Sequence, residues 1–278
     1  MHGGPHNAWS PAADPAHAYH QALVAAGWTV LLVNPRGSDG YGRHLFTAAV
    51  GAWGVADERD FLDPVDQLVA EGVADPARLA LTGYSYGGYM TCWLTGRTDR
   101  FAAAIAGGVV ADLTSMTGTS DAGEALALEF GDPVRDPEAV RAHSPITNVH
   151  RVRTPTLVLH GAADERCPVG QAEQWFTALR TQRVPTELVL FPGGSHLFIL
   201  DGRPPTGSAT AAGSSTGRCG TSPAPASTRR TGSGGWTPWP PRTASPARAW
   251  RSAGSGRTAT TSWSRWPPAC STGRPTSR

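Results

Sequence analysis

The stretch "RLALTGYSYGGYM" (residues 78–90) decides the fold. Its short apolar run ends at Gly83, a serine follows two residues later, and an apolar helical pattern begins directly after it. A strand that turns sharply into a helix around Gly-x-Ser-x-Gly is the setting of a nucleophile elbow. A strained turn of this kind costs on the order of 1–3 kcal/mol, which a purely structural turn has no reason to keep. The sequence therefore predicts that Ser85 is presented as a nucleophile.

Helical patterns and short aliphatic runs alternate on both sides of this stretch, from about residue 16 to residue 200. Such alternation is typical of βαβ units around a mostly parallel sheet with flanking helices. A long polar segment separates the third expected strand from the fourth. We expect strands over 28–34, 79–83, 101–107, 155–161 and 187–193, and helices near 16–26, over 58–72, from about 86, and near 170–179.

A serine hydroxyl is a poor nucleophile unless a base, itself held by a carboxylate, takes its proton. In an α/β-hydrolase the three residues follow in the order Ser, Asp or Glu, His. Asp164 and Glu165 follow the expected strand 155–161, and of the nine histidines only His196 comes after them. We interpret Asp164 as the acid because it lies closer to the strand end, with Glu165 as the alternative, and His196 as the base. This order predicts an α/β-hydrolase fold.

Acyl transfer also needs N–H donors for the developing oxyanion. The residue after the nucleophile supplies one, which is Tyr86. The loop "HGGP" (2–5) offers a second, because its glycines let backbone amides approach a bound carbonyl. His160, between an expected strand and a glycine, is interpreted as a packed structural histidine.

Composition narrows the class of protein. The 278 residues contain no uninterrupted apolar run of about 20 residues, so no membrane span is predicted. The first residues lack the basic and apolar regions of a signal peptide, which makes the cytoplasm the default location. The four cysteines have neither CxxC spacing nor a dense pattern, so we expect reduced thiols and no zinc site or disulfide framework.

Charge divides the chain into two unlike parts. Residues 1–202 hold all 22 carboxylates and 13 of the 24 Lys and Arg residues, whereas residues 203–278 hold the remaining 11, all arginine. Beyond residue 203 the apolar residues follow no helical or strand periodicity, and this pattern predicts disorder. We interpret residues 204–278 as the product of a GC-rich gene that is translated out of frame. The less favoured alternative is a basic arm with tryptophans that binds nucleic acid.

Nine stretches of the first part match one known pattern: "HGGPH" (2–6), "NPRGSDGYG" (34–42), "GAWG" (51–54), "GYSYGGYMT" (83–91), "TDRFAAAI" (98–105), "GTSD" (118–121), "SPITNV" (144–149), "HGAADERCPVGQAE" (160–173) and "FPGGSH" (191–196). With them the chain resembles the catalytic domain of the prolyl oligopeptidase family of serine peptidases, in its acylaminoacyl-peptidase and dipeptidyl aminopeptidase-like branch. The resemblance covers residues 1–203.

The resemblance implies Ser85 as nucleophile, Asp164 as acid, His196 as base, and Gly4 with Tyr86 as oxyanion donors. It implies that "GGVVADLTSM" (107–116) helps to line a substrate pocket, and no metal or cofactor. We expect a peptide substrate, no nucleic-acid or membrane partner, and leave a homo-oligomer open.

The chain also departs from the family pattern. From the residues given we expect no propeller domain ahead of the catalytic domain, no strand entering the "HGGP" loop, and no final helix after His196. We therefore expect a truncated and frameshifted piece that is poorly folded, with a gap inside its sheet.

Two other functions stay open. A carboxylesterase shares fold and triad, although its usual loop is HGGG where this chain has Pro5. An inactive fragment of a peptidase is the second alternative. Tyr84 and Tyr89 are interpreted as packing residues, Tyr86 as either packing or substrate stacking, and Arg36 as a member of a buried ion pair in preference to a substrate clamp.

Overall fold

The computed structural model describes residues 1–12, 14–201, 228–230 and 236–238. They fall into two compact units, one with residues 10–31 and the other with residues 1–9 and those from Leu32 onward. The smaller unit contains a 3-10 turn η1 (Pro15–His17) and the helix α1 (Tyr19–Ala25). Asp14 caps η1 by accepting hydrogen bonds from the backbone of Ala16 and His17. The helix expected near 16–26 is confirmed by α1.

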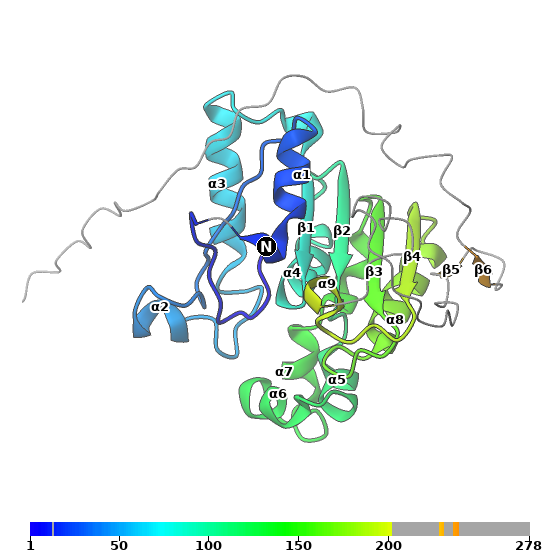
Figure 1. Cartoon of the computed structure of the whole chain (residues 1–278). Helices are drawn as coiled ribbons and strands as arrows, with labels where there is room; N and C mark the ends of the chain where they lie inside the picture. Colours follow the sequence, from blue (N-terminus) through cyan, green and yellow to red (C-terminus); the bar gives the residue numbers. More distant parts are fainter. Residues whose placement is uncertain (13, 202–227, 231–235, 239–278) are drawn as a thin grey trace, which may run out of the picture. The chain divides into compact units, whose positions relative to one another are not determined.

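The larger unit is built on one sheet (Figure 1), in which the strands follow one another in chain order. Its four parallel strands are β1 (Ala80–Tyr84), β2 (Ala103–Gly107), β3 (Thr156–Gly161) and β4 (Thr186–Phe191). Two short antiparallel strands follow, β5 (Thr228–Arg230) and β6 (Trp236–Pro238). Helices and a parallel sheet alternate as expected, and the predicted α/β-hydrolase class is confirmed.

The register of the parallel strands places their carboxyl ends at one edge of the sheet. Tyr84 of β1 pairs with Gly107 of β2, and Gly161 of β3 pairs with Phe191 of β4. Loops that leave these ends therefore meet, which is the usual place for a site in a parallel sheet.

Helices connect the strands and cover the sheet. They are α2 (Arg43–Thr47), α3 (Glu58–Ala70), α4 (Tyr86–Thr95), α5 (Leu113–Thr119), α6 (Gly123–Phe130), α7 (Pro137–Ala142), α8 (Val169–Thr181) and α9 (Phe198–Asp201), with 3-10 turns η2 (Pro76–Arg78) and η3 (Pro145–Arg151). α4 packs against β1 and β2, α8 packs against β3 and β4, and η3 contacts both helices. α5, α6 and α7 form a separate group at one end of the strands (Figure 1).

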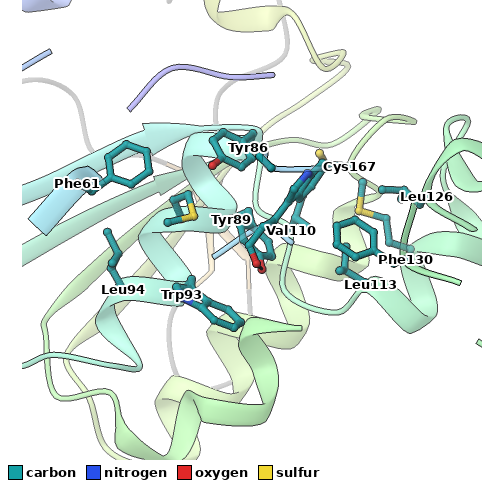
Figure 2. Packing of buried hydrophobic residues seen from close by; sticks show 14 of the residues in the cluster. Phe61, Tyr86, Tyr89, Trp93, Leu94, Val110, Leu113, Leu126, Phe130 and Cys167 are labelled. Atoms are coloured by element: carbon teal, nitrogen blue, oxygen red, sulfur yellow. Dashed lines mark hydrogen bonds between the residues drawn. The ribbon is translucent and has the colours of Figure 1, made fainter. Parts of the chain in front are cut away.

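The core is centred on α4, in which every residue is buried. Tyr86, Tyr89 and Trp93 follow one another along it, Phe61 lies on one side and Phe130 on the other (Figure 2). Small and apolar residues all round the helix explain why it can be covered on every side. The serine that precedes α4 is therefore attached to the most deeply packed helix of the unit.

Three expectations differ from the structure. Residues 28–34 form no strand, because a strand requires a paired neighbour and none of the described strands pairs with them. The polar segment after β2 forms three short helices, α5 to α7, that its composition does not predict. Four residues after the "FPGGSH" loop form α9, where no helix was expected.

The edge of β1 is partly occupied where a gap was expected. The backbone nitrogen of Met1 donates a hydrogen bond to the carbonyl of Thr82 (2.7 Å). The predicted boundary near residue 203 and most of the segment 204–278 lie outside the described residues, so the division into two parts stays a prediction. β5 and β6 are the parts of this segment that the structure describes.

Candidate active site

Ser85 stands at a strained turn between β1 and α4. Its backbone has φ 60° and ψ −119°, and it is one of two non-glycine residues with positive φ in the described part of the chain. Its N–H donates to the carbonyl of Gly107 (3.0 Å), which fixes the turn on the neighbouring strand. A Cβ on Gly83 would collide with the carbonyl of Gly87, so the strand and the helix lie too close for a side chain there. The elbow geometry predicted from the motif is present.

The loop 1–5 lies against this elbow. A Cβ on Gly87 would come within 2.5 Å of the carbonyl oxygen of Met1, and a Cβ on Gly3 within 3.4 Å of the Ser85 Cβ. Gly4 follows with φ 131°, a backbone conformation that favours glycine. Gly3 thus lies beside the serine, and the role of Gly4 as an oxyanion donor stays a prediction.

His196 lies in the loop after β4 and contacts both of its expected partners. Its Nε2 is 3.0 Å from the Ser85 Oγ, and its Nδ1 is 2.8 Å from the Asp164 Oδ2. With an N–H at Nδ1, the imidazole donates to the carboxylate and keeps a lone pair at Nε2 for the serine proton. The imidazole is 17% exposed and the Asp164 carboxylate is fully buried, so the ring is accessible from solvent while the carboxylate is sealed from water.

Asp164 is held on both oxygens. Its Oδ1 accepts a hydrogen bond from the Cys167 N–H (2.8 Å), and its Oδ2 faces His196. Glu165, the alternative acid, is exposed. The close approach of two loops makes the pairing with His196 feasible, because a Cβ on Gly161 would come within 2.7 Å of the Ser195 carbonyl oxygen.

Tyr84 supports the histidine loop, a role that the sequence did not predict. Its hydroxyl donates to the carbonyl of His196 (2.8 Å), and the two rings lie 5.4 Å apart. Because Tyr84 is the last residue of β1, it joins the strand that leads to Ser85 to the loop that carries His196. Nothing in the local sequence distinguishes this tyrosine from a packing residue.

Tyr86 contributes its backbone to the site and its side chain to the core. It is the first residue of α4, so its N–H is one of the donors that a helix leaves without an intrahelical partner. Its ring is buried, and its hydroxyl donates to the Asp57 carboxylate. The alternative that the ring stacks on a substrate is therefore not supported.

Asp57 is a buried acid that the sequence did not single out. Burial raises its pKa to about 7. Its other carboxylate oxygen, Oδ1, has no partner among the described residues. Its side-chain hydrogen-bond partner is Tyr86, the residue next to the serine.

His160 is buried and hydrogen-bonded at both nitrogens. Its Nδ1 accepts from the Val109 N–H (3.1 Å), and its Nε2 lies 2.7 Å from the Cys167 carbonyl, to which it donates. Burial lowers its pKa, which favours the neutral ring. It therefore has the packed, structural position that was predicted.

Arg36 pairs with Asp60, but the pair is not buried as expected. The guanidinium lies 3.1 Å from the Asp60 carboxylate and is 46% exposed. It follows the stretch 28–34 at the surface, and a solvated ion pair of this kind contributes little to stability.

Within the described residues, one group of side chains could hold a metal ion. Its members are Asp164, Cys167 and His196, whose donor atoms lie within 4.8 Å of one another. None of the helices in the described part of the chain has the length and apolar character needed to cross a membrane.

Known proteins match the same part of the chain. Residues 16–206 match the model of the prolyl oligopeptidase family. An uncharacterized peptidase of Bacillus subtilis, YuxL, is 40% identical over 211 residues, which are 73% of this chain and 31% of the relative. The acylamino-acid-releasing enzyme of Arabidopsis thaliana is 35% identical over 70% of this chain and 27% of its own length.

Solved structures agree with this assignment. The acylaminoacyl peptidase of Pyrococcus horikoshii superposes with a TM-score of 0.68 at 29% identity, over 72% of this chain and 33% of that one. A puromycin-hydrolyzing peptidase of Mycobacterium tuberculosis gives 0.62 at 32% identity, over 70% and 30%. The chain thus spans about a third of the length of the relatives that it matches. On the family match and these relatives together, the chain belongs to the prolyl oligopeptidase family.

Proposed function

We propose that this chain carries the catalytic centre of a serine-type peptidase that hydrolyses peptide bonds of oligopeptides through an acyl-enzyme. The observation that supports this most directly is the continuous chain of hydrogen bonds from Ser85 through His196 to Asp164.

In the first step, the Ser85 Oγ attacks the substrate carbonyl while His196 Nε2 takes its proton. Asp164 stabilises the imidazolium that forms, through the Nδ1 hydrogen bond. General-base help of this kind contributes about 10²–10⁴-fold to the rate. The position of His196, reachable from solvent but fixed by a buried carboxylate, suits this role.

The oxyanion of the tetrahedral intermediate accepts hydrogen bonds from the N–H groups of Tyr86 and Gly4. One such donor contributes about 2.7–4 kcal/mol to transition-state stabilisation. The Tyr86 N–H is suited to this because it opens α4, so the helix N-terminus adds its own partial positive charge.

Collapse of the intermediate breaks the C–N bond, and the imidazolium gives its proton to the leaving amine. The acyl group is now an ester of Ser85. A water molecule then attacks this ester, with His196 again as base, and releases the acid and the free serine.

The names of the relatives suggest which peptides to test. An acylaminoacyl peptidase is named for an N-terminally acylated residue, so we propose peptides with an acylated N-terminal residue as substrates. The pocket-lining role of residues 107–116, the cytoplasmic location and the choice between monomer and homo-oligomer stay predictions of the sequence.

The test compares an acetylated amino-acid anilide, the same amino-acid anilide with a free amine, and a short-chain nitrophenyl ester. The proposal expects turnover of the acetylated anilide that disappears in His196→Ala and falls in Asp164→Asn. Ester turnover without any amide turnover would favour a carboxylesterase, and no turnover of either would favour an inactive fragment.

A further inference from the structure

Three chemically different metal donors meet beside the proposed nucleophile. The carboxylate of Asp164, the thiol of Cys167 and the imidazole of His196 place one donor atom each within 4.8 Å of the others. They come from the loops after β3 and β4, which is why the spacing of the cysteines in the sequence predicted no zinc site.

We propose that Asp164, Cys167 and His196 bind Zn²⁺ and that this binding reversibly inhibits the peptidase. The inhibitory half of this inference rests on the function proposed above, whereas the metal site itself does not.

The donor set suits zinc. Zn²⁺ binds thiolate sulfur, imidazole nitrogen and carboxylate oxygen, and three protein ligands leave one tetrahedral position for water. With zinc–ligand bonds of about 2.0–2.3 Å, tetrahedral donors lie roughly 3.3–3.8 Å apart, so donor atoms within 4.8 Å of one another would draw together by about 1.5 Å at most. Of the three side chains the His196 imidazole is the most exposed, so rotation of its ring can supply part of this shift.

Cys167 is not explained by the serine mechanism. Its side chain is 1% exposed, and it lies in the core cluster with Tyr86 and Val110 (Figure 2). Burial raises the pKa of the thiol above its ordinary value, the nearby Asp164 charge adds to this, and a hydrogen bond with Ser85 opposes it. Zinc binding forms the S–Zn bond and releases the thiol proton to solvent.

Zinc bound by these three residues prevents His196 from acting as a base in either of two binding modes. If the metal takes the Nε2 of His196, it occupies the lone pair that would accept the Ser85 proton. If it takes Nδ1, the ring proton moves to Nε2, and that lone pair is again lost. In both modes one of the two hydrogen bonds of His196 breaks, with Ser85 or with Asp164.

The test uses the full chain with Cys219→Ser and Cys270→Ser, because these two thiols lie outside the described residues and would also bind metal. Co²⁺ serves as a spectroscopic substitute for Zn²⁺. We expect a thiolate-to-cobalt charge-transfer band in the near ultraviolet that Zn²⁺ abolishes by displacement.

Cys167→Ala should remove this band, and His196→Ala should weaken Zn²⁺ binding by about tenfold or more while leaving the thiol in place. Cys92→Ala is the matched control, because Cys92 is an equally buried thiol that is not part of the donor group. Circular dichroism checks that each variant is folded. A band that is absent from the background protein, or that survives Cys167→Ala, overturns the metal site.

Inhibition is read separately, as protection of the serine from a fluorophosphonate probe. Zn²⁺ should slow labelling of the background protein, and Cys167→Ala should need about tenfold more Zn²⁺ for the same effect. Labelling that Zn²⁺ does not slow, in a protein that shows the cobalt band, overturns inhibition alone. If no labelling occurs without metal, the proposed function fails, while the cobalt band still decides the metal site.

Discussion

Gly161→Ala tests whether the close approach of two loops positions the base. Gly161 ends β3, three residues before Asp164, and the loop that carries His196 passes directly over it. A Cβ at this position would lie 2.7 Å from the Ser195 carbonyl and closer still to that of Gly194, whereas real Cβ atoms essentially never come within 3.0 Å of such an atom. The histidine loop must therefore move by at least a few tenths of an ångström.

This movement acts on distances that have little tolerance. His196 is 2.8 Å from Asp164 and 3.0 Å from Ser85, and Gly194 also accepts a hydrogen bond from the Ala163 N–H (2.9 Å). A misplacement of about 1 Å costs about 10²-fold in rate, so a shift of a few tenths should cost about tenfold. Overpacking of a well-packed site also destabilises a protein by about 1–3 kcal/mol.

The assay measures the rate of fluorophosphonate labelling and the free energy of unfolding in urea. Gly170→Ala is the matched control, since a Cβ there has no atom within 4 Å. We expect the Gly161 variant to label about tenfold more slowly and the control to label at the wild-type rate. Wild-type labelling and stability in Gly161→Ala would refute the reasoning that this contact sets the geometry of the base.

Two further changes test the surroundings of the elbow. Asp57→Asn should change the pH dependence of stability. Burial raises the folded pKa of Asp57 from 3.8 to about 7, so the contribution of this carboxyl to stability is complete below about pH 4 and is lost as the pH rises through 7. Between pH 5 and pH 8 this loss should cost the wild type about 3 kcal/mol, and the variant should lack it. Urea unfolding at pH 5 and pH 8 measures this, and an equal loss in both proteins would contradict it. Tyr84→Phe removes the hydrogen bond to the His196 carbonyl, so we expect about 1 kcal/mol less stability and slower fluorophosphonate labelling. A variant that labels at the wild-type rate would show that the loop does not depend on this bond.

The parts of the fold that could be predicted are those that short stretches of sequence determine. β1, β3 and β4 are short apolar runs that end at glycine or turn residues, and α4 begins directly after the serine. Because parallel strands present their carboxyl ends together, the order of strands in the sequence was enough to predict Ser85, Asp164 and His196 at one edge of the sheet. In the structure the three side chains are in hydrogen-bond contact there.

Residues 28–34 show the limit of local patterns. Their apolar sequence is typical of a strand, but a strand exists only where a second segment supplies its hydrogen bonds. The helices α5 to α7 were missed for a related reason. Each has only 6 to 8 residues, and they contact one another, so packing stabilises them more than local propensity does.

The features of the site that the sequence did not predict depend on contacts between residues far apart in the chain. Asp57 meets Tyr86 across 29 positions of sequence, and Tyr84 meets His196 across 112. No spacing rule marks either pair. The donor group of Asp164, Cys167 and His196 is equally invisible in the sequence, because rules for metal sites search for cysteines and histidines a few residues apart.

The central claim is that Ser85 is activated by His196, and the site of covalent labelling tests it most directly. The full chain is treated with a fluorophosphonate, and the modified peptide is identified by mass spectrometry. We predict one adduct, on Ser85, that is absent after Ser85→Ala and nearly absent after His196→Ala. A folded chain that takes no adduct on Ser85, or that labels as fast without His196, would contradict the claim.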